Sequence, residues 1–410
     1  MTENQVAEAN LHYPANTAKD EFPEGYKQTE LGVIPEDWEI KALGTLLSIR
    51  HGKNQKEVES ENGAYPILAT GGQIGWSNSF LWDKPSVLIG RKGTIDKPRY
   101  VDKPFWTVDT LFYSDIKPTA DAKFLFYKFC MIDWMQYNEA SGVPSLNAST
   151  IEGVMVSMPS KTEQTAIANV LSDVDALINE QEKLIAKKQA IKTATMQQLL
   201  TGRTRLPQFV LHEDGSRKGY KQSELGEIPE DWEVYRFEQN FTIYAGGDVP
   251  KDSFSKIKTD SYPYPIFANA IQGRGLYGYT GHKRSKPDSV TITARGYLGH
   301  AEYRDEPFFP IVRLLVMEPL GTVDSKFTTY AINELVEFPT ESTGVPQLTA
   351  PQVGKFSISA PADLKEQTAI ATILSDMDEE IQALEQRLGK TRHIKQGMMQ
   401  ELLTGKTRLV

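Results

Sequence analysis

The chain has 410 residues, of which 40% are hydrophobic and 24% are charged, and a formal net charge of −9 at pH 7. These values are those of an ordinary globular chain of two or three domains. No apolar run approaches the length of a membrane span, and the polar, acidic amino end lacks the features of a secretory signal, so we expect a cytoplasmic protein. The single cysteine, Cys130, excludes an internal disulfide and a cysteine-based metal cluster.

After a polar arm at residues 1–25, the sequence contains one unit twice. The stretch ELGVIPEDWEI at residues 30–40 recurs as ELGEIPEDWEV at 224–234. Further along, EQTAIANVLSDVD from Glu163 recurs as EQTAIATILSDMD from Glu366. Self-similarity over such long distances indicates a duplicated fold.

Between these repeated stretches lie two variable regions. They share apolar, glycine and proline positions but differ in their polar residues, as where AYPILA at Ala64 corresponds to PYPIFA at Pro263. This pattern is typical of one scaffold that carries two different surfaces. Short β-rich runs such as SVLIG at Ser86 end in glycine-containing turns, whereas KFLFYKFCMIDWM at Lys123 has helical character. Each variable region is therefore predicted to be a mixed α/β domain.

Two long segments with helical periodicity follow the variable regions. In the first, apolar residues recur every seven positions in two adjacent stripes, Val170, Leu177, Leu184 and Ile191 beside Leu171, Ile178 and Ile185, and the second copy repeats the pattern from Leu374. Both segments end in TG(R/K)TRL, where Gly202 or Gly405 fits a helix stop. Because such a helix cannot bury its stripes alone, we expect the two helices to pack against each other as an antiparallel coiled coil.

In chain order, these signals predict seven segments. They are an arm (1–25), a first globular domain (26–160), a long helix (161–203), a linker (204–219), a second globular domain (220–361), a second long helix (362–405) and a tail (406–410). The predicted fold class is mixed α/β (α+β): two similar globular domains joined by two long antiparallel helices, with an internal pseudo-two-fold repeat.

Several fragments resemble parts of enzyme sites, but none is complete. GKT at Gly405 lacks the glycine that a phosphate-binding loop requires five positions earlier, where the chain has Gln400. EIK at Glu39 resembles a Mg²⁺-dependent nuclease site, but the second copy has EVY at Glu233, so we interpret the repeated acids as solvated or partner-facing. The six histidines show no spacing typical of zinc ligands. We therefore predict no catalytic residue and no metal site.

The variable regions instead contain features of nucleic-acid binding. Acidic residues are concentrated at 1–40 and 220–234, and in both variable regions a basic turn between glycines follows a glycine-rich loop. Lys and Arg can hold phosphates, Arg can recognise guanine, and Asn or Gln can recognise adenine. The candidate DNA-binding residues are Thr70, Gly72, Gln73, Arg91, Lys92, Thr94 and Arg99 in the first copy, and Asn269, Gln272, Arg274, Lys283, Arg284, Arg295 and Tyr297 in the second. An ordinary solvated turn is the alternative interpretation of each.

The duplicated order of IPEDWE anchor, variable domain, EQTAIA helix and LLTG(R/K)TRL stop resembles the specificity (S) subunit of type I restriction-modification enzymes over residues 26–410. The resemblance implies that each variable domain is a target recognition domain for one half of a bipartite, asymmetric site in double-stranded DNA. It implies that the helices space the halves and dock two methyltransferase (M) subunits, and that restriction (R) subunits join them. AdoMet, ATP and Mg²⁺ would then belong to these partners, with no cofactor in this chain.

Two other classes stay open on the residues alone. A duplicated coiled-coil structural or interaction protein without DNA specificity would not need a basic turn in both variable regions. A DNA methyltransferase or nuclease with its own unrecognised active site would need a catalytic motif, and the sequence offers none.

Overall fold

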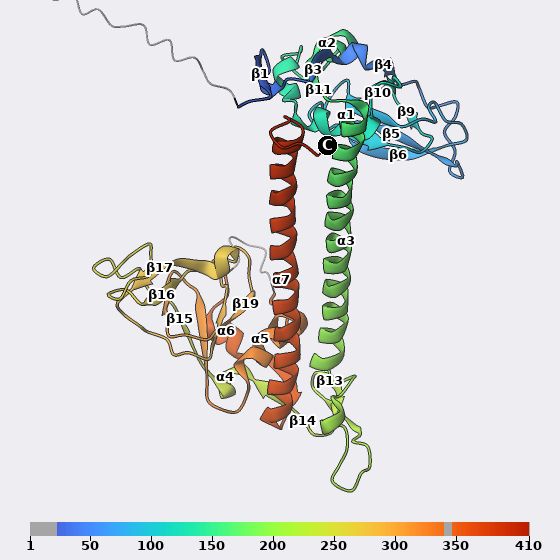
Figure 1. The fold of residues 1–410 in the computed structure, drawn as a ribbon. Helices are drawn as coiled ribbons and strands as arrows, with labels where there is room; N and C mark the ends of the chain where they lie inside the picture. Colours follow the sequence, from blue (N-terminus) through green and yellow to red (C-terminus); the bar gives the residue numbers. More distant parts are fainter. Residues whose placement is uncertain (1–22, 340–346, 410) are drawn as a thin grey trace, which may run out of the picture. The chain divides into compact units, whose positions relative to one another are not determined.

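The computed structural model describes residues 23–339 and 347–409, which form two compact units. The first unit comprises the chain up to Glu180 together with the residues from Leu388 onward, and the second comprises Gln181–Arg387. Each unit therefore contains one globular domain and part of each long helix (Figure 1). Almost all of the predicted arm, residues 1–25, lies outside the described residues.

The globular part of the first unit is built from two sheets and short helices. Its elements, with the long helix that follows them, are β1 (Tyr26–Thr29), β2 (Gly32–Pro35), β3 (Glu39–Ala42), β4 (Leu47–His51), β5 (Tyr65–Ala69), β6 (Gly72–Ser77), β7 (Ser86–Gly90), β8 (Arg99–Val101), β9 (Trp106–Thr107), β10 (Leu111–Ile116), α1 (Ala122–Met131), α2 (Ala148–Gly153), β11 (Met155–Met158) and α3 (Lys161–Leu200). The larger sheet is antiparallel in the order β4-β10-β7-β8, and α1 packs against β7 and β8. The smaller sheet has the order β6-β5-β9, and the pairs β1-β2 and β3-β11 complete the domain.

The second unit repeats this architecture. Its elements, with the second long helix, are β12 (Tyr220–Ser223), β13 (Gly226–Pro229), β14 (Trp232–Arg236), α4 (Phe237–Asn240), β15 (Phe241–Ala245), β16 (Tyr264–Phe267), β17 (Leu276–Thr280), β18 (Ser289–Ile292), β19 (Ala301–Arg304), β20 (Phe309–Pro310), β21 (Leu315–Pro319), α5 (Ser325–Leu335), α6 (Ala350–Gly354), β22 (Ser357–Pro361) and α7 (Leu364–Leu402). The sheets β15-β21-β18-β19 and β17-β16-β20 match those of the first unit strand for strand. The predicted mixed fold with an internal repeat is confirmed.

Burial of apolar side chains explains why these segments form the core. All five residues of β7, SVLIG, are buried, as expected for a central strand covered on both faces. Helix α1 begins after Asp121, whose carboxylate accepts hydrogen bonds from two backbone N–H groups of the first turn. Trp38 and Trp232, from the two IPEDWE copies, are fully buried in the two cores. These tryptophans fasten the start of each domain to its centre.

The two long helices have 40 and 39 residues, which corresponds to about 60 Å each at 1.5 Å per residue. In the second unit, Lys188 pairs with Glu380 (2.6 Å) and Lys192 with Asp378 (2.5 Å). Residue numbers rise along α3 while those of their partners fall along α7, so the predicted antiparallel packing is confirmed. Asp378 also accepts a hydrogen bond from Tyr330 of α5 (2.8 Å), which ties the globular domain to both helices.

The first unit contains the equivalent contact. Tyr127 of α1 donates to Asp175 of α3 (2.7 Å), and Asp175 pairs with Lys395 of α7 (2.5 Å). Burial and the adjacent carboxylate raise the pKa of Tyr127, so its hydroxyl stays protonated and continues to donate. The same three residue types thus fix each globular domain to its pair of helix segments.

Only one of the two predicted stripes is buried between the helices. The buried stripe contains Leu171, Ile185, Leu374, Ile381 and Leu388. In the other stripe, Leu177, Leu184 and Ile191 are 47%, 40% and 41% exposed. The expectation that the stripe beginning at Val170 also packs between the helices is wrong over these three residues, because the seam between two helices is narrow.

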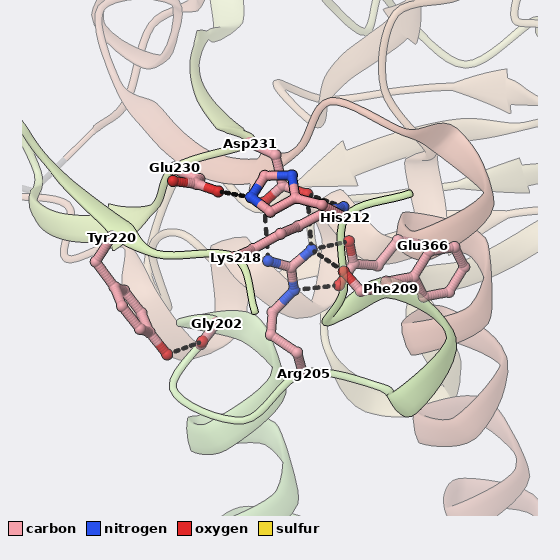
Figure 2. Close-up of polar contacts among 9 residues, drawn as sticks. All are labelled: Gly202, Arg205, Phe209, His212, Lys218, Tyr220, Glu230, Asp231 and Glu366. Carbon is pink, nitrogen blue, oxygen red and sulfur yellow. Dashed lines mark hydrogen bonds and ion pairs between the residues drawn. The ribbon is translucent and has the colours of Figure 1, made fainter. Parts of the chain in front are cut away.

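Arg205, just beyond α3, joins the end of this helix to the second IPEDWE sequence (Figure 2). Its Nε and Nη2 donate to the two carboxylate oxygens of Glu366, both at 2.6 Å, and Nη1 and Nη2 donate to Asp231 at 2.8 and 3.0 Å. Lys218 donates to Asp231 as well (2.7 Å). Burial alone would raise the pKa of Asp231, but the hydrogen bonds from Arg205 and Lys218 outweigh it and lower the pKa to about 2.

The first unit contains the same cluster, formed by residues at opposite ends of the sequence. Arg408 donates to Glu163 (2.6 and 2.9 Å) and to Asp37 (2.9 and 2.8 Å). The interpretation of the repeated acids as solvated or partner-facing is therefore wrong for Asp231, which is half-buried, whereas Asp37 is solvent-exposed and also ion-paired. Both carboxylates are held by an arginine that follows the long helix.

The glycine of TG(R/K)TRL is required for two physical reasons. Gly202 and Gly405 have φ values of +68° and +78°, which confirms the predicted helix stop. A Cβ on Gly202 would lie 2.4 Å from Pro229 Cγ, and one on Gly405 would lie 2.5 Å from Pro35 Cδ. The glycine therefore lets the helix end approach the proline of the IPEDWE sequence.

Candidate nucleic-acid interface

The basic turn of the first copy lies where β7 ends and β10 begins. The backbone N–H groups of Arg91 and Lys92 donate to the carbonyl of Thr110 at 2.8 and 3.3 Å. Gly90 is so close to the other side of the turn that a Cβ would lie 2.2 Å from the carbonyl oxygen of Thr94. The residues between the two glycines are thus held in a tight turn at the end of the central strands β7 and β10 of the larger sheet.

Two neighbouring cations of this turn have different environments. Nη1 of Arg91 lies 2.7 Å from both carboxylate oxygens of Asp109, which neutralises its charge. Lys92 is exposed, and its side chain makes no hydrogen bond or ion pair with another described residue. Thr94 is half-buried. The charge that is free to meet a phosphate or a base edge is therefore that of Lys92.

The predicted glycine-rich loop lies against this turn. Thr70 lies close to Gly90, because a Cβ added to Gly90 would lie only 3.0 Å from Thr70 Cγ2. Arg99 donates to the carbonyl of Thr70, and Gln73 donates to the carbonyl of Gly75 in its own strand, β6 (3.2 Å). Gly72 begins β6 with φ +137°. The structure brings these predicted residues together, but it uses Arg99 to hold the loop.

The turn of the second copy is held by an amide side chain. Asn269 Oδ1 accepts a hydrogen bond from Ala294 N, and its Nδ2 donates to the carbonyl of Arg295, both at 2.6 Å. Both ends of the amide are occupied, so Asn269 positions the turn in this structure. Arg295 and Tyr297 are exposed, Tyr297 by 69%.

The glycine-rich loop of the second copy is hydrogen-bonded to β19. Arg274, with φ +54°, donates from Nε to Glu302 (3.0 Å) and from Nη2 to the carbonyl of Tyr303 (2.7 Å). Burial would raise the pKa of Glu302, but hydrogen bonds from His300 and Arg274 outweigh it and lower the pKa. Gln272 is exposed on this loop.

Lys283 and Arg284 lie over aromatic rings of the second unit, one in the smaller sheet and one in the larger. Lys283 Nζ is 5.9 Å from the ring centre of Tyr264, and the guanidinium of Arg284 is 5.5 Å from that of Tyr244. Both cations are exposed. Cation–π contact orients them while leaving their charge at the surface.

Two further arginines, one buried and one exposed, lie near this site, and the sequence-based candidates did not include Arg313. Arg304 is buried, stacks 3.7 Å over Phe267, and has a pKa lowered to about 10 by burial, so it serves the interior. Arg313 is exposed and makes no hydrogen bond or ion pair with another described residue. It follows EPFFPIV, the counterpart of KPFWTVD at Lys103, and this correspondence was the available signal.

The chain contains two copies of one scaffold, which expose different polar residues at equivalent turns and are joined by paired helices. This arrangement defines a two-module recognition protein. A family model described as the type I restriction modification DNA specificity domain matches residues 35–193 and 229–391. The chain belongs to this family of type I restriction-modification specificity subunits. Its members supply DNA sequence specificity and are not catalytic, so the structural-protein and enzyme alternatives are not supported.

Relatives and a solved structure cover nearly the whole chain. The putative type I restriction enzyme MjaX specificity subunit of Methanocaldococcus jannaschii is 26% identical over 94% of this chain and 97% of its own length. The MjaVIII specificity subunit of the same organism is 24% identical over 94% of this chain and 96% of its own length. The crystal structure of the type I restriction-modification S subunit from M. genitalium has a TM-score of 0.64 at 17% identity, and covers 89% of this chain and 96% of that one. This structural match confirms the fold.

Among the helices of the described ranges, none contains an apolar stretch that could span a lipid bilayer. The same residues contain no group of three or more His, Cys, Asp or Glu side chains placed to hold a metal ion.

Proposed function

We propose that this chain selects the DNA site of a type I restriction-modification complex, with residues 26–160 and 220–361 each recognising one half of a bipartite, asymmetric target. One observation carries the proposal: the two domains have the same strand order but different chemistry at equivalent turns. Where the first copy has Lys92, the second has Arg295. The Arg91–Asp109 ion pair of the first copy corresponds to two apolar residues in the second, Ala294 and Val312. Two domains with the same backbone scaffold but different side chains at the equivalent turns are suited to recognising different bases.

The remaining parts of the proposal concern the partners. The helices space the two half-sites and bind two methyltransferase subunits, which are joined by restriction subunits. AdoMet is then bound by the methyltransferase subunits, and ATP with Mg²⁺ by the restriction subunits, in the cytoplasm. Support for docking on the helices comes from Leu184 and Ile191, which expose apolar surface on α3 that no described element covers fully.

Exchange of one recognition domain tests the division of labour. Residues 26–160 are replaced by those of another family member, the chain is co-expressed with its methyltransferase subunits, and methylated sites are sequenced. We expect one half of the target to change and the other half and the gap to stay the same. The matched exchange of residues 220–361 should change only the other half. If both halves change in either exchange, the two domains do not act independently.

Docking is tested by two substitutions on the exposed side of α3. Leu184→Ser and Ile191→Ser should lower the yield of complex with methyltransferase subunits while the isolated chain stays folded. Ala194→Ser, at another exposed position of the same helix, is the matched control. Unchanged assembly in both test variants would place the docking surface elsewhere.

A further inference from the structure

The loop between β20 and β21 has an unusual backbone. Val312 and Arg313 have φ values of +43° and +62°, two consecutive residues in the left-handed region. This region is rare for residues other than glycine, asparagine and aspartate, and rarest for a β-branched residue such as valine. The equivalent positions of the first copy, Asp109 and Thr110, do not have positive φ values.

Hydrogen bonds on both sides hold this backbone in place. The N–H of Val312 donates to the carbonyl of Gly247 (2.8 Å), and that of Ile311 donates to the carbonyl of Phe267 (2.9 Å). Gly246, beside Gly247, is packed so closely that a Cβ would lie 2.8 Å from Pro310. The loop is therefore clamped between the ends of β15 and β16.

The strain does not serve the packing of the core. Val312 is 55% exposed and Arg313 is exposed as well. Strained backbone that presents side chains to solvent is a feature of binding and catalytic sites, where neighbouring structure fixes a conformation that the sequence would not choose. The conformation thus points to a ligand of this loop.

The register of the sheet places the loop beside the basic turn. Ile292 of β18 pairs with Leu315 of β21. The residues after β18 and those before β21 therefore meet at the same end of these two central strands. Arg295 comes from the first segment and Arg313 from the second. Neither guanidinium makes a hydrogen bond or ion pair with a residue in the part of the chain that the structure describes.

The first copy has different side chains at the equivalent end of its central strands. Its arginine, Arg91, is on the turn after β7 and is neutralised by Asp109, whereas Val312 replaces Asp109 in the second copy. The second copy therefore presents an unpaired guanidinium next to an exposed apolar side chain. A guanidinium can donate two hydrogen bonds to O6 and N7 of guanine, and an aliphatic side chain can contact the methyl group of thymine.

We propose that Arg313 is a specificity-determining residue that recognises a guanine in the half-site of the second domain, with Val312 against a neighbouring base. This inference rests on the proposed function, because it assumes that residues 220–361 recognise one half of the target. It goes further in assigning a base class to a residue on a strained loop.

The test uses the full chain assembled with its methyltransferase subunits. Arg313→Gly removes the guanidinium and tolerates positive φ, and Arg313→Lys keeps the charge without the fork of donors. Methylated sites are sequenced, and binding to duplexes with each base at each target position is measured. We expect Arg313→Gly to lose about ten-fold to a hundred-fold of discrimination at one guanine of one half-site, and Arg313→Lys to restore affinity without discrimination. Arg217→Ala, at an exposed arginine away from the loop, should change nothing.

Two outcomes overturn the proposal. Equal weakening at every target position in Arg313→Gly would mean that Arg313 contacts a phosphate, and an unchanged site spectrum would mean that it contacts no DNA. Failure of the proposed function looks different, because the wild-type complex would then show no split target. A split wild-type target with an unaltered Arg313→Gly spectrum contradicts only the inference about Arg313.

Discussion

Substitution of one glycine at the end of α7 should destabilise the first unit strongly. In Gly405→Ala, the new methyl group would have to adopt φ +78° and would lie 2.5 and 2.6 Å from Cδ and Cγ of Pro35. A left-handed alanine costs about 1–2 kcal/mol, and overpacking of a close contact costs about 1–3 kcal/mol more. We therefore expect the free energy of unfolding of this unit to fall by about 2–5 kcal/mol.

The same substitution elsewhere in α7 provides a matched control. Gly389 is inside the helix, its φ is not positive, and a Cβ there would meet nothing within 4 Å. Because alanine is better than glycine in a helix interior by about 1 kcal/mol, Gly389→Ala should stabilise the first unit. Two substitutions of one chemical type, sixteen residues apart, are thus expected to have opposite signs.

Peptide-resolved hydrogen exchange is the suitable assay, since a chain of two units need not unfold in one step. In Gly405→Ala, peptides covering β1 and β2 and those covering the end of α7 should exchange faster, while peptides of the second unit stay protected. Equal protection in Gly405→Ala and wild type would refute the argument from close approach. Loss of protection in Gly389→Ala would show that the helix itself does not tolerate a methyl group.

Three further substitutions test the ion pairs and hydrogen bonds. Asp231 has a pKa of about 2 in the folded chain against an ordinary 3.8, so its contribution to stability is present above about pH 4 and is lost as the pH falls to about 2. Because solvent screens part of the ion-pair energy, Asp231→Asn should lower the free energy of unfolding measured by urea titration at pH 7 by about 1–2 kcal/mol, and it should flatten this acid dependence. Lys128 is buried beside Leu403, and desolvation lowers its pKa from 10.5 to about 7. Between pH 7 and pH 10.5 the folded state therefore binds fewer protons than the unfolded state, so the free energy of unfolding rises with pH over this range. Lys128→Met should abolish that rise, and a rise that persists in the variant would contradict the assignment to Lys128. Tyr127→Phe removes the hydrogen bond to Asp175 and should destabilise the first unit by about 1–1.5 kcal/mol in the same assay, whereas no change would mean that the bond adds nothing to stability.

The sequence predicted those features that depend on local pattern or on repetition. The duplicated IPEDWE sequence predicted the two domains, because a repeat can be recognised in the sequence alone. The seven-residue period that includes Leu171 and Ile185 predicted the long helices for the same reason. The stop at Gly405 followed from its position after a periodic segment. The prediction that Leu184 packs between the helices was wrong, since two adjacent stripes look alike until a partner helix covers one of them.

Contacts between distant residues could not be predicted in this way. Asp37 is held by Arg408, 371 residues further along the chain, and no local signal predicts this ion pair. Arg91 looks like a free cation until the fold brings Asp109 to it. The left-handed backbone at Val312 contradicts the preference of valine, so local propensity pointed away from it. Such departures from local preference are expected where the surrounding fold and a binding role decide the conformation.

We infer that one scaffold, present twice with different side chains at equivalent turns, recognises two different half-sites. The decisive experiment is to sequence all sites methylated by the chain together with its methyltransferase subunits. We expect a target of two unlike half-sites separated by a constant number of unspecified base pairs, with one half changed when residues 220–361 are exchanged. A palindromic target, or a single uninterrupted one, would contradict it.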